Sequence, residues 1–326
     1  MTGLSDSFQR PINYLRISVT DRCNLRCIYC MPSDGIKLMN HNDILTYEEI
    51  YTIAQAAAEL GISKVRVTGG EPLVRSGLPQ LIQMLSGINT VDDISLTTNG
   101  TLLTSYAAEL KQAGLNRVNI SLDTLNPDKF KRITRSNSNL SDVLAGIKAA
   151  KAAGLNPVKL NMVVMADTND DEILDFGAKT ISDGWHVRFI EFMPVTGENA
   201  VRLVTVSDMR KRLEKLGELE PCLPDVGNGP AKYFRFPQAK GTIGFITPVS
   251  EHFCFHCNRL RLTADGKLRP CLLSEDEIDL RQPLRSGVSL SKLKQLIEEA
   301  VARKPLRHHI AEGYVPKDRP FSQVGG

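Results

Sequence analysis

Six of the seven cysteines fall into two groups of three, an arrangement that favours metal chemistry. Cys23, Cys27 and Cys30 form the first group, spaced as C-x3-C-x2-C. A structural zinc site normally closes its shell with four ligands, whereas three thiolates can hold three irons of a cubane cluster and leave the fourth open. Zinc remains the simpler alternative. We predict a [4Fe–4S] cluster whose fourth iron takes a small molecule as its ligand.

The second group lies more than two hundred residues downstream and repeats the same incomplete ligand set. Cys254, Cys257 and Cys271 stand in the stretch CFHCNRLRLTADGKLRPC, and Arg259 and Arg261 follow the close pair. Three thiols again fall one short of a closed shell. The sequence therefore predicts a second metal centre with an open position.

The remaining thiol and the neighbouring histidines carry weaker signals. Cys222 is alone in a loop rich in Pro and Gly, and we interpret it as a bystander. His256 lies inside the C-x2-C turn, where a side chain usually points away from the metal. His308 and His309 belong to a polar tail, so we expect both to be solvated.

Composition and charge are those of an ordinary globular protein, and the charge alone excludes neither nucleic acid nor membrane as a partner. The chain has 326 residues, of which 42% are hydrophobic and 24% charged, as in ordinary globular proteins. Its 40 basic and 37 acidic residues give a net charge of +3, too small for a basic coat against nucleic acid or membrane. No apolar run or signal core appears, so we predict a cytoplasmic protein in a reducing compartment, without disulfides.

Short β-like runs alternate with amphipathic helices from residue 14 to about residue 217. The predicted strands are 15–19, 64–68, 93–99, 117–123, 157–164 and 185–192. The predicted helices are 46–60, 78–88, 103–113, 141–153, 169–182 and 207–216. Six βα units in series imply a parallel sheet with helical crossovers. The fold class is therefore α/β, either doubly wound or curled into a barrel.

The strands favour the barrel because their residues alternate between apolar and polar. Helices must cover the apolar face, so the polar face should line an interior cavity. This lining would carry Arg16, Lys64, Arg66, Lys159 and Arg188, with few acids such as Asp123. Buried unpaired cations are costly, so such a lumen favours an anionic guest. The alternative is surface charge on an ordinary twisted sheet. We predict a partial (βα)6 TIM-like barrel.

The alternation of strands and helices ends near residue 217, and this change predicts two regions. Residues 5–217 would form the partial barrel, and residues 218–326 a C-terminal region that binds the second cluster and the substrate. This region has β-like pieces at 233–236 and 241–250, a helix at 289–304, and a tail that ends in Gly325-Gly326.

The first cysteine group resembles the signature of radical S-adenosylmethionine enzymes, since an aromatic residue, Tyr29, precedes its last cysteine. In that superfamily the open iron chelates S-adenosylmethionine, whose cleavage releases a 5′-deoxyadenosyl radical. The segment TGGEP (68–72) resembles the motif whose backbone receives the methionine amino group. Glycines would permit that close approach.

The second group closely resembles the C-terminal cluster of the GTP 3′,8-cyclases of molybdenum cofactor biosynthesis, and the likeness covers nearly the whole chain. The resemblance implies two [4Fe–4S] clusters, on Cys23, Cys27 and Cys30 and on Cys254, Cys257 and Cys271. It implies S-adenosylmethionine contacts from Tyr29, Gly70, Ser121 and Met193. It implies GTP contacts from Arg16, Arg66, Thr97, Lys159, Arg259, Leu260 and Arg261.

The same resemblance implies a mechanism and partners. The radical would abstract the ribose 3′ hydrogen of GTP, and the substrate radical would attack C8 of guanine. Cys23, Cys27 and Cys30 would serve catalysis through their cluster, and Arg259 and Arg261 are candidates for the final reduction. An external electron donor and a homodimer are expected, and the Gly-Gly tail should enter the active site. The rivals are a radical enzyme that modifies peptides and a zinc-stabilised nucleotide-binding module.

Overall fold

Parallel strands alternate with helices through the first two thirds of the chain, as the hydrophobic pattern predicts. The structure is a computed structural model that describes residues 3–194, 202–223, 226–316 and 319–325. The strands are β1 (Tyr14–Ser18), β2 (Lys64–Thr68), β3 (Asp93–Thr98), β4 (Arg117–Ser121), β5 (Val158–Val164), β6 (His186–Glu191), β7 (Glu220–Cys222), β8 (Lys232–Arg235), β9 (Thr242–Ile246), β10 (Arg259–Leu262), β11 (Lys267–Arg269) and β12 (Ile278–Asp279). The helices are α1 (Tyr47–Glu59), α2 (Leu78–Ser86), α3 (Leu103–Gln112), α4 (Pro127–Thr134), α5 (Leu140–Ala152), α6 (Ile173–Ser182), α7 (Val206–Leu213), α8 (Arg281–Arg285), α9 (Leu290–Ala302) and α10 (Phe321–Val324).

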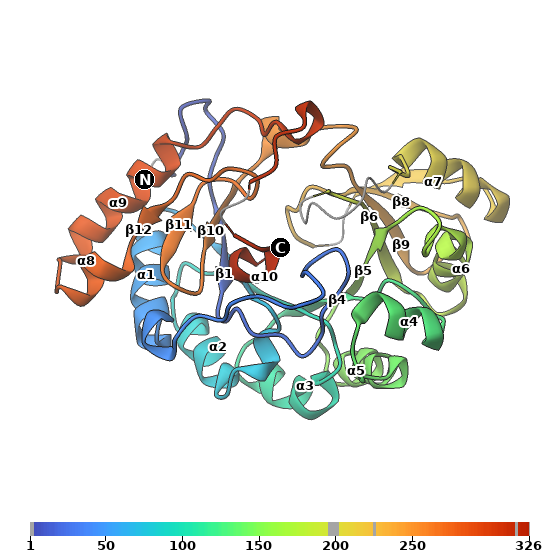
Figure 1. Cartoon of the computed structure of the whole chain (residues 1–326), viewed down its shortest axis with the longest axis horizontal. Coiled ribbons are helices and arrows are strands. Elements are labelled where there is room, and N and C mark those ends of the chain that lie inside the picture. Colours follow the sequence, from blue (N-terminus) through green and yellow to red (C-terminus); the bar gives the residue numbers. More distant parts are fainter. Residues whose placement is uncertain (1–2, 195–201, 224–225, 317–318, 326) are drawn as a thin grey trace.

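All described strands belong to one curved sheet in the order β12-β11-β10-β1-β2-β3-β4-β5-β6-β9-β8-β7. Strands β1 to β6 are neighbours in sequence order and run parallel. Helices α1 to α7 lie outside the sheet, and α10 lies within its curve (Figure 1). No pairing joins the outer strands β12 and β7 within the described ranges, so the barrel is open. The predicted partial barrel is confirmed.

The C-terminal region is not set apart from this sheet. Strand β10 pairs parallel with β1, and β9 pairs parallel with β6. Residues beyond 217 therefore extend the barrel at both edges rather than forming a layer of their own. This places the second cysteine group beside the first strand of the barrel. The predicted boundary at residue 217 stays a prediction.

Local signals explain where helices begin. Helix α1 starts at a capping box: the Thr46 side chain accepts a hydrogen bond from the Glu49 amide, and Glu49 accepts one from the Thr46 amide. Helix α4 was not predicted. It begins at Asn126, whose side chain accepts from the amides of Asp128 and Lys129, with Pro127 in the first turn.

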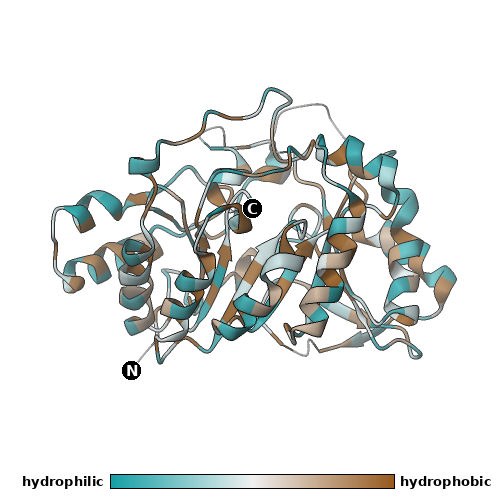
Figure 2. Ribbon diagram, turned by 90° about the horizontal axis from the view of Figure 1, so that it is seen from below, coloured by the Kyte–Doolittle hydropathy of each residue, from teal (hydrophilic) through white to brown (hydrophobic). Residues whose placement is uncertain are grey.

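The core lies between the sheet and its outer helices. Each of the strands β1 to β4 contributes a fully buried side chain to this core: Ile17, Val67, Leu96 and Ile120. The helices in front in Figure 2 carry both hydrophobic and hydrophilic residues. Burying one such side chain stabilises the fold by about 1.5–3 kcal/mol relative to exposing it. The opposite face of the strands is left to polar residues. In the part of the chain that the structure covers, no helix is long and apolar enough to cross a bilayer.

Candidate active site

Two adjoining cavities occupy the interior of the barrel. The first, of about 200 Å³, is lined by all three residues of the first cysteine group, with Gly70, Ser121 and Asp123. The second, of about 180 Å³, is lined by the second cysteine group and five arginines. Both cavities are lined by Thr97, Asn161, Ile190 and Met193. A molecule in one cavity therefore lies against a molecule in the other.

The glycines after β2 let this strand end pack against the first cysteine loop. A Cβ atom at Gly70 would lie 2.4 Å from the carbonyl oxygen of Arg22, and one at Gly69 would lie 2.6 Å from that of Thr20. The Gly70 amide donates a 2.7 Å hydrogen bond to the Thr20 carbonyl. The motif predicts that these glycines admit a ligand. The structure shows that they first admit the chain's own backbone.

Glu71 connects this loop to the end of β3 and was missed from the sequence. Its buried carboxylate accepts hydrogen bonds from the Thr98 hydroxyl and the Asn99 amide, both 2.7 Å, and from the Leu73 amide. The Asn99 side chain in turn contacts Cys23 Sγ at 3.9 Å. Burial raises the pKa of Glu71 to about 7. The TGGEP motif contained this residue, but nothing in the motif indicated its partners.

The residues predicted to contact S-adenosylmethionine meet in the first cavity. Tyr29, Gly70, Ser121 and Met193 all line it. The Tyr29 hydroxyl donates a 2.8 Å hydrogen bond to Asp123. Burial and the adjacent Asp123 hold the pKa of Tyr29 well above its usual range, so it remains a donor. Burial also raises the pKa of Asp123 to about 6.

The cysteine groups lack the spacing of a single-ion site. Any two ligands of one zinc ion, bound at about 2.0–2.3 Å, can be no more than about 4.6 Å apart. Among the described residues, one group of at least three His, Cys, Asp or Glu side chains has its ligand atoms all within 4.8 Å of one another. That group is His252, Cys254 and His308. Neither cysteine group meets this limit. Both groups therefore fit a cluster, whose thiolates bind separate irons, better than zinc.

The two groups differ in electrostatics. Burial raises the pKa of Cys23 to about 11 and that of Cys30 to about 12, so a bound metal must displace protons there. Burial also raises the pKa of Cys257, but the charges of Arg259 and Lys304 outweigh it and lower this pKa to about 6. Cys257 of the second group therefore offers a preformed thiolate, whereas burial raises the pKa of Cys254 as it does those of the first group.

The second cavity is strongly cationic. Arg16, Arg66, Arg188, Arg259 and Arg261 line it, and no Asp or Glu does so within the described part of the chain. Burial, and next to it the charge of neighbouring arginines, lowers the pKa of Arg16 well below its usual value, and burial lowers those of Arg66 and Arg261 to about 10. With a pKa of about 10, Arg66 and Arg261 stay protonated at neutral pH, so the cavity favours an anion.

Three of these arginines form a row across neighbouring strands. Arg261 on β10 is in register with Arg16 on β1, and Arg16 is in register with Arg66 on β2. Residues in register on adjacent strands present their side chains on one face. Like charges placed opposite one another destabilise a sheet. The three arginines therefore repel one another, and they do so at the position where the sequence predicted an anionic ligand.

Unpartnered polar atoms at the common wall also indicate a missing ligand. Thr97 Oγ1 and Asn161 Oδ1 are buried and make no hydrogen bond within the described residues. Buried polar atoms are nearly always paired. Thr97 was predicted as a GTP contact, while Asn161 was missed. Its place on the polar face of a predicted strand was a signal that could have identified it.

Three predicted lumen or substrate residues lie elsewhere. Lys159 is buried, but its Nζ atom donates to the Val226 carbonyl at 2.9 Å, and it does not line either cavity. Leu260 packs in the hydrophobic core, so only its backbone could face a ligand. Their GTP contacts stay predictions. Lys64 pairs with Asp92 at 3.1 Å instead of facing the lumen, so that expectation was wrong.

The C-terminal tail enters the barrel. The Gly325 carbonyl accepts hydrogen bonds from Arg16, at 2.9 and 3.2 Å, and from Arg261 at 2.7 Å. Gly325 has φ +66°, and a Cβ atom there would lie 2.3 Å from Thr68 Cγ2. The structure thus brings Gly325 to the cationic row, as expected of the tail. Gly326 lies outside the described residues.

His308 corrects an expectation about the tail histidines. It is 6% exposed and stacks edge-on against His252, with ring centroids 4.9 Å apart. Burial, and next to it His252, lowers its pKa to about 4, so the ring is neutral. His309 is exposed and pairs with Glu312. The residues around position 308 form no periodic pattern that could distinguish the two histidines in advance.

Comparisons with known proteins agree with these features. The radical SAM superfamily model matches residues 17–178, and the molybdenum cofactor synthesis C model matches residues 185–310. Proteins called GTP 3′,8-cyclase from Pelotomaculum thermopropionicum and Moorella thermoacetica are 53% and 51% identical to this chain. Each match covers 99% of this chain and all of the relative.

Solved structures show the same fold at low identity. SuiB from Streptococcus suis, bound to S-adenosylmethionine, is 13% identical, with a TM-score of 0.63 over 87% of this chain and 68% of that one. SuiB bound to its precursor peptide SuiA has a TM-score of 0.64. This likeness shows the architecture alone and does not favour the peptide-modifying alternative. The full-length relatives, at half identity or more, show that the chain belongs to the GTP 3′,8-cyclase family of radical S-adenosylmethionine enzymes.

Proposed function

We propose that this chain converts GTP to (8S)-3′,8-cyclo-7,8-dihydroguanosine 5′-triphosphate, the first step of molybdenum cofactor biosynthesis. The observation that carries the proposal is the pair of adjoining cavities. One combines the first cysteine group with the predicted S-adenosylmethionine contacts, and the other combines the second group with five arginines. When bound, an iron–sulfur cluster and S-adenosylmethionine supply the deoxyadenosyl radical that removes a hydrogen atom from the substrate.

Residues of the first cavity would hold the cofactor. Cys23, Cys27 and Cys30 would supply the thiolates, and the Tyr29 loop is held by its bond to Asp123. The Glu71–Asn99 connection holds Cys23 against the end of β3. Fixed geometry is what directs a radical to one atom of its substrate, because correct placement removes competing encounters.

Residues of the second cavity would bind the nucleotide. A triphosphate carries about four negative charges, and the planar fork of arginine suits phosphate oxygens. The row of Arg261, Arg16 and Arg66 supplies such forks on one face of the sheet. Two unpartnered oxygens lie at the wall common to both cavities. Thr97 Oγ1 can donate to or accept from the ribose, and Asn161 Oδ1 can accept from it. This wall is where hydrogen transfer between the bound molecules has to occur.

We further propose that the second group binds a second [4Fe–4S] cluster, whose open iron holds the guanine base. Support comes from the place of Cys254, Cys257 and Cys271 in the lining of one cavity and from the thiolate character of Cys257. Anaerobic iron and sulfide analysis should give about eight irons per chain, and about four for Cys271→Ser. Two zinc ions and no sulfide would favour the zinc module instead. A homodimer and an external electron donor complete the proposal.

The activity is tested by anaerobic incubation of the reconstituted chain with reductant, S-adenosylmethionine and GTP. We expect 5′-deoxyadenosine and a cyclised product of unchanged GTP mass, both detected by mass spectrometry. Parallel incubations without nucleotide and with ATP are the controls. If 5′-deoxyadenosine forms equally in all three, GTP is not the substrate.

A further inference from the structure

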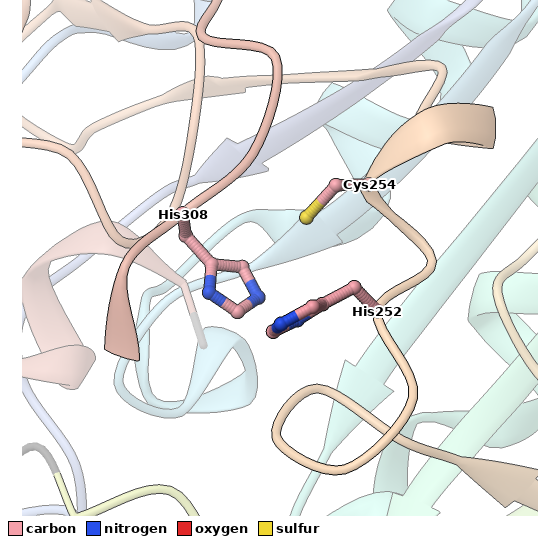
Figure 3. Close-up of side chains that lie close together, drawn as sticks. All are labelled: His252, Cys254 and His308. Atoms are coloured by element: carbon pink, nitrogen blue, oxygen red, sulfur yellow. The ribbon is translucent and has the colours of Figure 1, made fainter. Parts of the chain in front are cut away.

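Two histidines that are not needed for a cluster lie next to one of the second group's cysteines. His252 and Cys254 lie on the loop before β10, and His308 comes from the segment after α9. Figure 3 shows the Cys254 sulfur and the two imidazole rings converging from these separate segments. One ligand atom from each residue lies within 4.8 Å of the other two. This limit is close to the separation of about 4.6 Å that the most distant ligands of one ion can have.

The orientation of the two rings also fits one ion. An imidazole bound at about 2.0–2.1 Å places its ring centroid about 3.2 Å from the ion, so two rings at a tetrahedral angle have centroids about 5 Å apart. The centroids of His252 and His308 are 4.9 Å apart, with the ring planes at 81°. Two imidazoles and one thiolate leave a fourth position for water.

One nitrogen of each ring lacks a partner, whereas His308 Nδ1 accepts from the Ile310 amide at 3.5 Å. His252 Nδ1 and His308 Nε2 are buried and make no hydrogen bond within the described residues. A buried nitrogen without a partner is costly, and a bound cation would satisfy a lone pair. His308 is also almost completely buried, at 6% exposure. Together with the convergence of the three ligand atoms, these unpartnered buried nitrogens indicate a missing ligand.

The surrounding backbone is held in place by buried cations. Arg10 donates to the carbonyls of Cys254, at 2.7 Å, and of Pro305 and Leu306, at 2.7 and 2.9 Å. Lys304 Nζ donates to the carbonyls of Arg259 and Pro270. Both connect the cysteine loop to the segment that carries His308. The three ligands are therefore positioned before any metal arrives.

We propose that His252, Cys254 and His308 form a mononuclear site for a divalent transition metal, of which Zn²⁺ is the probe, when the second cluster is absent. The thiol of Cys254 loses its proton to the solvent as the metal–sulfur bond forms. Cys254 cannot serve this ion and the cluster together, so the two metal states exclude one another. The mononuclear site does not depend on the proposed activity. Only the competition between the two metal states depends on the proposed second cluster.

The site is tested with Co²⁺, whose absorption reports both thiolate ligation and tetrahedral geometry. The full chain, with Cys23, Cys27 and Cys30 changed to Ser and stripped of iron, is titrated anaerobically. We expect one Co²⁺ per chain with the charge-transfer intensity of a single thiolate. The added changes Cys257→Ser and Cys271→Ser should leave this signal, because neither thiol belongs to the site.

Matched histidine variants separate the site from general effects of substitution. His308→Ala should weaken Co²⁺ binding at least about 100-fold, the upper end of what losing an outer-shell partner costs. His309→Ala, one residue away and exposed, should not weaken it. The proposal is overturned if the signal survives His308→Ala, or if it requires Cys257 and Cys271.

A second measurement does not depend on a variant that folds. Zn²⁺ bound to the iron-free chain should protect Cys254 from alkylation at least about tenfold more than Cys257 and Cys271, as mapped by mass spectrometry. Equal protection of all three thiols would overturn the proposal. Prior Zn²⁺ should also block the second set of about four irons during reconstitution. If Cys254 is protected yet no second cluster forms without Zn²⁺, the cluster proposal fails and the mononuclear site stands.

Discussion

Replacing Gly325 with alanine should release the tail from the cationic row without unfolding the barrel. Its φ of +66° costs a residue with a side chain about 1–2 kcal/mol. The new Cβ would also lie 2.3 Å from Thr68 Cγ2, and overpacking of this kind costs about 1–3 kcal/mol. The two effects together weaken docking of the tail by about 2–5 kcal/mol. The ratio of docked to undocked tails therefore falls at least about 30-fold.

Hydrogen exchange of the C-terminal peptide measures this docking, since the Gly325 amide bonds to the Phe321 carbonyl only when α10 is formed. Exchange should accelerate at least about 30-fold in Gly325→Ala. Gly313→Ala is the matched control, because Gly313 has φ +83° but a Cβ atom added there would meet no other atom within 4 Å. Adding Thr68→Ser to Gly325→Ala removes the methyl group that the new Cβ meets. The double variant should therefore regain the docking free energy lost to the steric clash and keep the loss caused by the unfavourable φ. Unchanged exchange in Gly325→Ala, or no recovery with Thr68→Ser, would refute the reasoning.

Three further predictions concern residues of the two cavities. Because burial raises the pKa of Glu71 from 4.5 to about 7, its stabilising contribution is full below pH 4.5 and is lost as pH rises through 7. Urea unfolding of the metal-free chain at pH 5 and pH 8 should therefore show a difference in stability that Glu71→Gln reduces by about 2.5 kcal/mol. Arg66→Ala should weaken GTP binding about 10- to 150-fold by calorimetry on reconstituted protein, whereas Arg285→Ala, on the outer surface, should not. Lys159→Ala should lower the free energy of unfolding by about 0.5–1.5 kcal/mol, because the bond to the Val226 carbonyl is lost, and should change GTP affinity less than Arg66→Ala.

The barrel could be predicted because its signal is local and repeated. Strands such as Leu15 to Val19 and Lys64 to Thr68 alternate in sequence, and Thr46 and Glu49 mark the start of helix α1. Helix α4 escaped because its eight residues carry no long apolar stripe, and only its cap at Asn126 marks it. The addition of β9 and β10 to the sheet edges escaped for another reason: pairing between strands far apart in sequence leaves no periodic trace.

The site could be predicted in its residue types but not in its contacts. Cysteine spacing and the polar strand faces indicated both centres and most arginines. Glu71 and His308 were missed because their importance comes from partners distant in sequence, Asn99 and His252. Lys64 was misplaced because alternation predicts the face of a strand but not the depth of a residue along it. At the strand end, a long side chain reaches an acid outside the barrel instead.

The arginine row shows what the C-terminal strands add to the barrel. Without β10, the second cavity would keep Arg16 and Arg66 but lose Arg261 and the cysteines behind it. Placing a third guanidinium in register with two others opposes folding, since like charges on neighbouring strands repel. The chain offsets part of this cost with the Gly325 carbonyl, which lies against Arg16 and Arg261 and carries only a partial charge. A polyanion offsets it far better, so the repulsion that weakens the empty sheet becomes binding energy for the nucleotide. The same strand that brings the second cysteine group to the barrel thus also sets the charge that the substrate must match.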